Sequence, residues 1–299
     1  MRHSALLAGT SLFAIILSSN FARADGYQPR SIGYRPCIAN SIEQSNNQLS
    51  VDYKSLGMGY EEILDNGKTF DTEKGDVRGF GVAVTFMSTC RQDVLNDLYF
   101  RGEYSRYRGD THYIGGSADG RLPFGSIVDN HRATIDDFDF RLGKGFALGR
   151  DFMITPFFGI GHHEWDRAVN AGEDYKNGYY GAGLLLQWSP VHSFVLSADG
   201  LIGRTFDANV FVKANPGFNP DTSLDLGSSR IYKVGVSGDY ALTPLAHVNA
   251  GVEWTGFEYG ESPVVNGILE PFSRTRDVTF RVGVGIGFGG PRDSYAPLK

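Results

Sequence analysis

The segment Arg274-Thr-Arg-Asp-Val-Thr-Phe-Arg-Val-Gly-Val-Gly-Ile-Gly-Phe288 decides the fold. From Val278 to Phe288 every second residue is apolar, and the residues between them are polar or glycine. Successive side chains of a β-strand point to opposite faces, so the segment predicts a strand with one apolar and one polar face. An apolar face of this length, ending in an aromatic residue, suits a tilted strand that crosses the hydrocarbon layer of a membrane.

The N-terminus has the features of a secretory signal peptide. A basic start is followed by an apolar run from Ala5 to Leu17 and by the small-residue site Ala22-Arg-Ala24. We expect cleavage after Ala24 and export of the rest of the chain. The predicted organisation is a signal peptide (1–24), an irregular periplasmic lead-in (25–47), a barrel (48–290) and a C-terminal tail (291–299).

Composition favours short strands and argues against nucleic-acid binding. The net charge is −6, and without residues 1–24 the chain keeps 26 basic against 34 acidic residues, a net charge of −8. An acidic chain without a basic cluster is a poor nucleic-acid partner. The 39 Gly, 21 Phe and 15 Tyr, with a mean hydropathy of −0.23, are typical of many strands with alternating polarity.

Ten alternating segments follow the lead-in, and the connections between them alternate in length. Connections after even-numbered segments are short, whereas those after odd-numbered segments are mostly longer and polar, which is typical of bacterial outer-membrane barrels. The sequence therefore predicts an all-β fold, a transmembrane antiparallel up-and-down barrel of about ten strands with short periplasmic turns and longer extracellular loops. The expected segments are 48–60, 76–89, 95–108, 131–147, 151–166, 175–189, 191–207, 228–242, 244–259 and 273–290.

The alternation assigns the apolar faces to lipid and the polar faces to the interior. Leu56 and Met58 break phase with Tyr53, and Arg204 falls on an apolar face, so we expect a bulge or a rim position at each. Aromatic residues on the apolar faces are expected to form belts at the membrane surfaces. They are Tyr53, Tyr104, Tyr180, Trp188, Tyr232, Tyr240, Trp254 and Phe288.

The polar faces carry charges of both signs, which predicts a network of paired side chains inside a narrow barrel. The alternatives are a small pore lined by these charges and a catalytic pair in the lumen. The expected network residues are Asp52, Lys54, Arg101, Glu103, Asp137, Asp139, Arg141, Asp199, Lys233, Asp239, Glu253, Asp277 and Arg281.

Cys37 and Cys90 are the two cysteines of the chain. In an exported protein such a pair predicts a disulfide, with two unpaired thiols as the alternative. The predicted topology places Cys37 before the first strand and Cys90 in the first short turn, both at the periplasmic rim. A disulfide there would tie the lead-in to the barrel.

Over residues 48–290 the pattern resembles the Gram-negative outer-membrane β-barrel superfamily. The last strand, closing on Phe288, resembles the superfamily's C-terminal assembly signal, although this chain continues from Gly289 to Lys299. The resemblance implies that outer-membrane lipid, lipopolysaccharide and the barrel assembly machinery are partners.

An outer-membrane hydrolase is the alternative function. Omptins are ten-stranded proteases with acids and a histidine at the outer rim, and here the candidate catalytic residues are His163, Asp136, Asp137 and Asp166. We find no Asp-x-His pair on a late strand, and His192-Ser193-Phe194 lacks the His-x-Ser-Asn motif of lipid A deacylases.

A third hypothesis is a soluble periplasmic β-protein. We expect no cofactor and no metal, because no zinc-ligand spacing occurs and the adjacent His162 and His163 point to opposite faces of a strand. The glycines of Gly285-Ile-Gly-Phe-Gly-Gly290 are expected to relieve crowding inside the barrel rather than to bind a dinucleotide.

Overall fold

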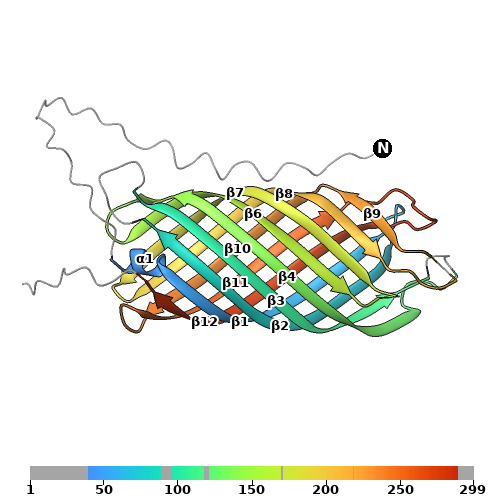
Figure 1. Cartoon of the computed structure of the whole chain (residues 1–299), viewed down its shortest axis with the longest axis horizontal. Helices are drawn as coiled ribbons and strands as arrows, with labels where there is room; N and C mark the ends of the chain where they lie inside the picture. The colour runs from blue at the N-terminus through green and yellow to red at the C-terminus, as the bar shows by residue number, and fades with distance from the viewer. Residues whose placement is uncertain (1–39, 89–95, 118–120, 170, 218, 289–299) are drawn as a thin grey trace, which may run out of the picture. The chain divides into compact units, whose positions relative to one another are not determined.

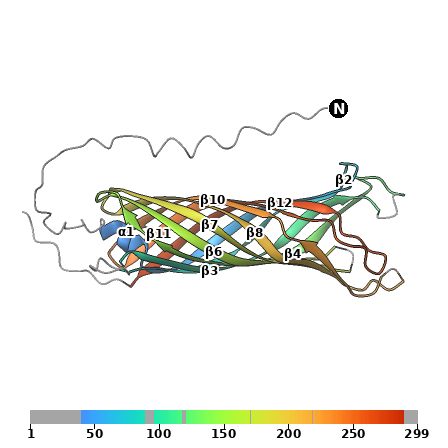
Figure 2. The same ribbon diagram turned by 90° about the horizontal axis from the view of Figure 1, so that it is seen from above.

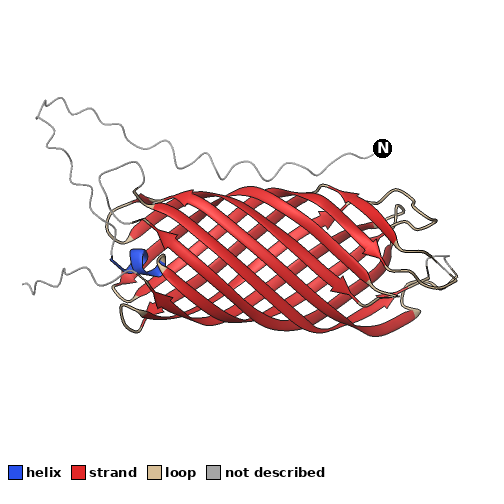
Figure 3. Cartoon of the chain, in the orientation of Figure 1, coloured by secondary structure: helices blue, strands red, loops and turns tan. Residues whose placement is uncertain are grey.

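The computed structural model describes residues 40–88, 96–117, 121–169, 171–217 and 219–288. Within them, ten long antiparallel strands form one tilted sheet that closes on itself (Figures 1 and 3). The long strands are β1 (Gln48–Ile63), β2 (Thr69–Met87), β3 (Leu98–Gly115), β4 (Ile127–Lys144), β6 (Phe152–Arg167), β7 (Glu173–Val191), β8 (Phe194–Val212), β10 (Arg230–Ala241), β11 (Ala246–Tyr259) and β12 (Phe272–Gly287).

Closure comes from the pairing of the first strand with the last. β1 pairs with both β2 and β12, and β8 pairs with β10, so each long strand has a neighbour on both sides. Two short strands are additions to this barrel: β5 (Phe146–Ala147) pairs with β6, and β9 (Thr222–Gly227) folds back on the end of β8. The view from above shows the same tilted wall (Figure 2).

The prediction of ten antiparallel strands in a barrel is confirmed, but the strands are longer than expected at the extracellular end. The prediction of an extracellular loop over residues 61–75 is wrong, because β1 and β2 pair as far as Ile63 and Thr69. Part of the predicted fourth loop is strand as well, because β8 continues to Val212 and β9 pairs with it. β2 ends at Met87 and β3 begins at Leu98, whereas the expected segments end at residue 89 and begin again at residue 95.

The wall has an apolar exterior and a polar interior, as the alternation predicted. Tyr53 and Val284 are 57% and 59% exposed, whereas Asp52 is 1% exposed and Asp139 and Arg141 are 7% exposed. In water this distribution would leave the apolar exterior exposed to solvent. In a bilayer the same face meets hydrocarbon, which is the favourable arrangement.

Two predicted irregularities have different outcomes. Leu56 and Met58 are buried on the inward face, in phase with Lys54, and β1 pairs regularly there, so the expected bulge is wrong. The inward face of β1 becomes apolar toward the extracellular end. Arg204 is exposed on the outer face and pairs with Arg230 near the end of the barrel wall, as expected for a rim position.

Two glycines of β12 make room inside the barrel. A Cβ added at Gly283 would collide with the carboxylate of Asp52, and one at Gly285 would collide with the side-chain amide of Gln48. This agrees with the predicted role of glycine in relieving interior crowding.

A short helix, α1 (Asn40–Ser45), precedes β1 at the end of the barrel that carries the short turns (Figure 1). Its Ile42 is fully buried, and the helix contacts β7, β8 and β10. In the described part of the chain no helix has the length and apolar character needed to cross a membrane. The predicted signal peptide, both cysteines and the residues after Phe288 lie outside the described residues.

Replacing Val284 on the lipid-facing wall by arginine should destabilise the barrel by about 2–4 kcal/mol, because a charge then enters hydrocarbon. The matched control is Val264→Arg, since Val264 is 67% exposed in the extracellular loop and Val284 is 59% exposed on the wall. The control should change stability by no more than about 0.5 kcal/mol. Urea unfolding in lipid vesicles measures both, and equal effects would contradict the lipid-facing assignment.

Candidate functional site

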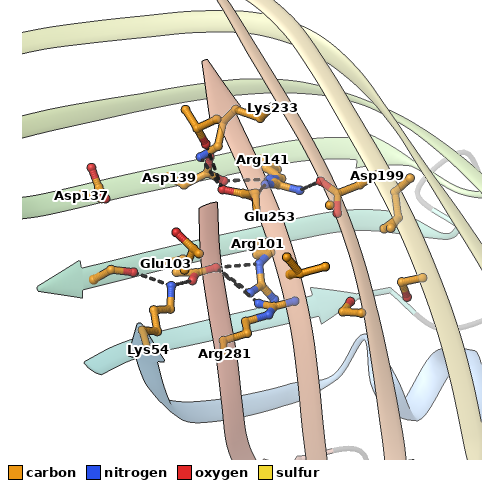
Figure 4. A pocket seen from close by; sticks show the side chains of 18 of the residues that line it. Lys54, Arg101, Glu103, Asp137, Asp139, Arg141, Asp199, Lys233, Glu253 and Arg281 are labelled. Atoms are coloured by element: carbon orange, nitrogen blue, oxygen red, sulfur yellow. Dashed lines mark hydrogen bonds and ion pairs between the residues drawn. The ribbon is translucent and has the colours of Figure 1, made fainter. Parts of the chain in front are cut away.

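The first cluster of charges in the lumen surrounds the carboxylate of Glu103 on β3. It receives the ammonium of Lys54 from β1, and Arg101 Nη2 lies 2.6 Å from its Oε2. Arg281 of β12 approaches the same oxygen at 3.9 Å. Lys54 also donates to Ser105 Oγ at 2.6 Å. Three cations thus share one buried carboxylate (Figure 4).

The second cluster is centred on Arg141 of β4. Its guanidinium contacts Asp139 at 2.8 Å, Asp199 at 2.7 Å and Glu253 at 3.5 Å. Lys233 of β10 lies 3.3 Å from Asp139 and 3.3 Å from Glu253, which links β4, β8, β10 and β11 across the lumen (Figure 4). The first cluster has two more cations than carboxylates, and the second has one more carboxylate than cations, so the two excesses partly offset each other. Buried charges are tolerated only when they are paired in this way.

The other predicted lumen residues lie apart from these clusters. Asp239 accepts one hydrogen bond from Gln48 Nε2 at 2.9 Å and pairs with His247 Nδ1 at 2.7 Å, nearer the short turns. Asp277 accepts a long bond, 3.4 Å, from the backbone N–H of Gly59. Neither oxygen of Asp52 has a hydrogen-bond partner among the described residues.

A third cluster, at the extracellular end, was not predicted. Arg167 of β6 is 1% exposed and contacts four carboxylates. Its guanidinium nitrogens lie 3.1 Å from Glu62, 3.1 Å from Asp71, 2.5 Å from Glu73 and 3.1 Å from Glu173. The guanidinium also lies over the rings of Tyr60 and Trp165, with its carbon 4.9 and 5.3 Å from their centroids.

A fifth carboxylate joins this cluster from the loop between β11 and β12. Glu270 accepts a hydrogen bond from Tyr175 OH at 2.6 Å and from Tyr60 OH at 3.1 Å. Tyr175 stacks on Trp165 with centroids 5.2 Å apart. Aromatic rings and carboxylates from strands β1, β2, β6 and β7 therefore surround a single guanidinium, and Glu270 joins them through the two tyrosines.

The alternation contained the signal for this cluster. Tyr60 and Glu62 continue the inward phase of Lys54 on β1, and Asp71 and Glu73 continue the inward phase of Thr85 on β2. The expected strands end at residue 60 and resume at residue 76, so Glu62, Asp71 and Glu73 fall in a predicted extracellular loop, whereas Tyr60 falls in a predicted strand.

The four residues of the alternative hydrolase site are divided by the barrel wall. His163 and Asp137 face inward, and His163 Nδ1 lies 2.7 Å from Asp137 Oδ1. Asp136 faces outward, where Tyr104 OH donates to it at 2.6 Å. Asp166 is also on the outer face, 3.7 Å from Lys213. In the described ranges no group of three or more His, Cys, Asp or Glu side chains is arranged to hold a metal.

A closed wall in which every long strand is paired on both sides satisfies its own backbone, which is the condition for crossing lipid with strands. The wall is apolar outside, and its long hairpins and short turns lie at opposite ends. The chain has the outer-membrane β-barrel fold.

Solved structures similar to this barrel are outer-membrane proteins. The outer membrane protease OmpT from Escherichia coli has a TM-score of 0.48 at 10% identity, over 82% of this chain and 98% of that one. The outer membrane protein OprG from Pseudomonas aeruginosa has a TM-score of 0.35 at 12% identity, over 82% and 99%. Comparison of the sequence with protein-family models and with curated proteins finds no match.

Replacing Arg167 by methionine should destabilise the barrel by about 3–5 kcal/mol, because the change leaves buried carboxylates without their cation. Arg106→Met is the matched control, since Arg106 is 36% exposed and has one ion pair at 3.6 Å, to Asp136. Its effect should be no more than about 1 kcal/mol. Urea unfolding in vesicles gives both values, and a neutral Arg167→Met would show that the cluster does not depend on its guanidinium.

The extracellular cluster should loosen as the pH rises. Burial, followed by the charge of Glu173, raises the pKa of Glu270, which lies beyond the spanning strands, to about 8. A carboxyl group whose folded pKa is raised contributes stability below its unfolded pKa of about 4.3 and loses it as the pH rises through about 8. Hydrogen exchange of residues 260–271 should therefore accelerate between about pH 5 and pH 8 beyond its intrinsic pH dependence and show no further excess above pH 8. Glu270→Gln should abolish this excess, and an unchanged excess in the variant would refute the assignment.

Proposed function

We propose that this chain is a non-enzymatic outer-membrane barrel whose lumen is closed to solutes and whose role is structural or surface-exposed. The observation that carries the proposal is the succession of three layers of side chains across the lumen. A helix lies at the end with the short turns, charged clusters lie in the middle, and Arg167 with its carboxylates lies at the extracellular end.

The first layer is formed by α1 and the residues that follow it. Ser41 Oγ lies 2.5 Å from Ser189 Oγ on β7. Asn46 and Gln187 exchange two amide hydrogen bonds of 2.7 and 3.0 Å. These contacts connect the N-terminal segment to the opposite side of the barrel, which favours a helix that blocks this end.

The middle layer lines a cavity, and the extracellular layer lies beyond it. The ion pairs of Glu103 and Arg141 surround a cavity of about 150 Å³, and Arg167 with its aromatic neighbours lies above it. A small water-filled pore is the alternative function. It would require rupture of the Arg167 ion pairs and displacement of α1, so we favour the closed barrel.

The surroundings of the barrel follow from the same proposal. A signal peptide at residues 1–24 would export the chain, and the barrel assembly machinery would recognise the last strand, which closes on Phe288. Lipid and lipopolysaccharide would cover the apolar wall. A Cys37–Cys90 disulfide would anchor the lead-in beside α1, and the hairpins beyond the apolar band would form the surface available to other molecules.

An omptin-like hydrolase is not favoured. A catalytic histidine and its acids must meet at one substrate, within hydrogen-bond reach of the reacting atoms. His163 and Asp137 lie inside the wall, whereas Asp136 and Asp166 lie outside it.

Planar bilayers test the closed barrel. The wild-type protein should insert without measurable conductance, whereas a variant that combines Arg141→Ala and Arg167→Ala with deletion of residues 40–46, and so disrupts all three layers, should open discrete channels. Heat-modifiable gel migration confirms that both proteins are folded. Steady channels from the folded wild-type protein would overturn the proposal in favour of the small pore.

A further inference from the structure

The outer face of the wall carries two pairs of arginines that lie directly opposite each other on neighbouring strands. Arg78 of β2 is in register with Arg108 of β3, and Arg230 of β10 is in register with Arg204 of β8. All four side chains are exposed. Like charges directly opposite on one face of a sheet repel each other and destabilise the pair, so each pair calls for a counter-charge.

Both pairs lie at the edge of the apolar band. Arg78 is the next outward position after Phe80, and Arg230 is the next outward position after Tyr232. Arg204 stands between Ile202 and Phe206, which are 59% and 41% exposed. The boundary between hydrocarbon and water is where lipid headgroups lie and where basic side chains reach them.

Two other outward arginines, Arg106 and Arg274, have a carboxylate within 4.0 Å, and these four do not. Arg106 lies 3.6 Å from Asp136, and Arg274 lies 3.3 Å from Glu258. Arg132 and Arg276 also have no ion pair among the described residues, but they lie opposite Asp110 and Gly256 rather than opposite another arginine. Among the described residues, no ion pair within 4.0 Å involves any member of the two pairs. Arg204 donates one hydrogen bond, of 3.2 Å, to the hydroxyl of Ser228.

We propose that each arginine pair binds a phosphate on the headgroup of an anionic lipid in the outer leaflet. Guanidinium groups match phosphate oxygens with two parallel hydrogen bonds, and the phosphate would replace repulsion between the arginines with two charge-assisted contacts. The inference rests on the outer-membrane location proposed above. It adds a lipid-binding site to a wall otherwise described only as apolar.

The strand order fixes the number of lipids. One pair spans β2 and β3 and the other spans β8 and β10, so three strands of the wall separate them in either direction. One headgroup cannot bridge both pairs, and the expected stoichiometry is two lipids per barrel.

Native mass spectrometry of the full chain in a neutral detergent, with phosphorylated lipid A as the probe, tests this site. The wild-type protein should retain two lipid A molecules. The double variants Arg78→Gln/Arg108→Gln and Arg204→Gln/Arg230→Gln should each retain one, and the quadruple variant none. Arg132→Gln is the matched control, because Arg132 is exposed on β4 but lies opposite Asp110. It should retain two.

Three results would overturn the proposal. They are equal retention of dephosphorylated lipid A, two retained molecules in the quadruple variant, and displacement of lipid A by an equal concentration of inorganic phosphate. Heat-modifiable migration identifies folded variants, and we expect them to fold because the changes relieve repulsion. A wild-type barrel that conducts would refute the closed lumen without changing the lipid count.

Discussion

The pairing of the first strand with the last is the interaction on which the rest of the structure depends. β1 meets β12 over almost its whole length, so the sheet has no free edge between its long strands. In hydrocarbon an unpaired N–H or C=O group costs several kcal/mol, on the order of the net stability of a small domain. Once the backbone groups of all long strands are paired, the side chains that contact hydrocarbon need only be apolar, and charged side chains must face the lumen.

Placing charges inside a narrow barrel creates the second constraint, which is compensation. Glu103 collects three cations and Arg141 collects three carboxylates, so strands far apart in sequence become linked across the lumen. The same requirement brings carboxylates from β1, β2 and β7 to Arg167. A lumen satisfied by its own side chains has little capacity left for solutes, which connects the stability of the barrel to the proposed closed state.

Buried arginines of the lumen are paired with carboxylates, whereas some arginines of the outer wall are not. Inside, a buried guanidinium such as that of Arg141 has several carboxylates. On the outer face, Arg78 of β2 lies directly opposite Arg108 of β3. Neither arginine has an ion pair to a carboxylate among the described residues. Desolvation demands a protein partner for the buried groups, whereas the outer face is free to take its counter-charge from the lipid.

The amino-acid sequence was sufficient to predict ten long strands, the hydrocarbon-facing wall and the face on which most strand residues lie. These depend on a two-residue period that is visible along the chain, as in Val278 to Phe288. Only the tertiary structure decided which charges meet, because the stagger of the closed barrel sets which inward residues share a level. His163 and Asp137 could be predicted as neighbours, whereas the convergence on Arg167 and the seating of α1 could not. Those contacts cross the lumen between elements that are not paired neighbours in the sheet, so the strand pattern does not predict them.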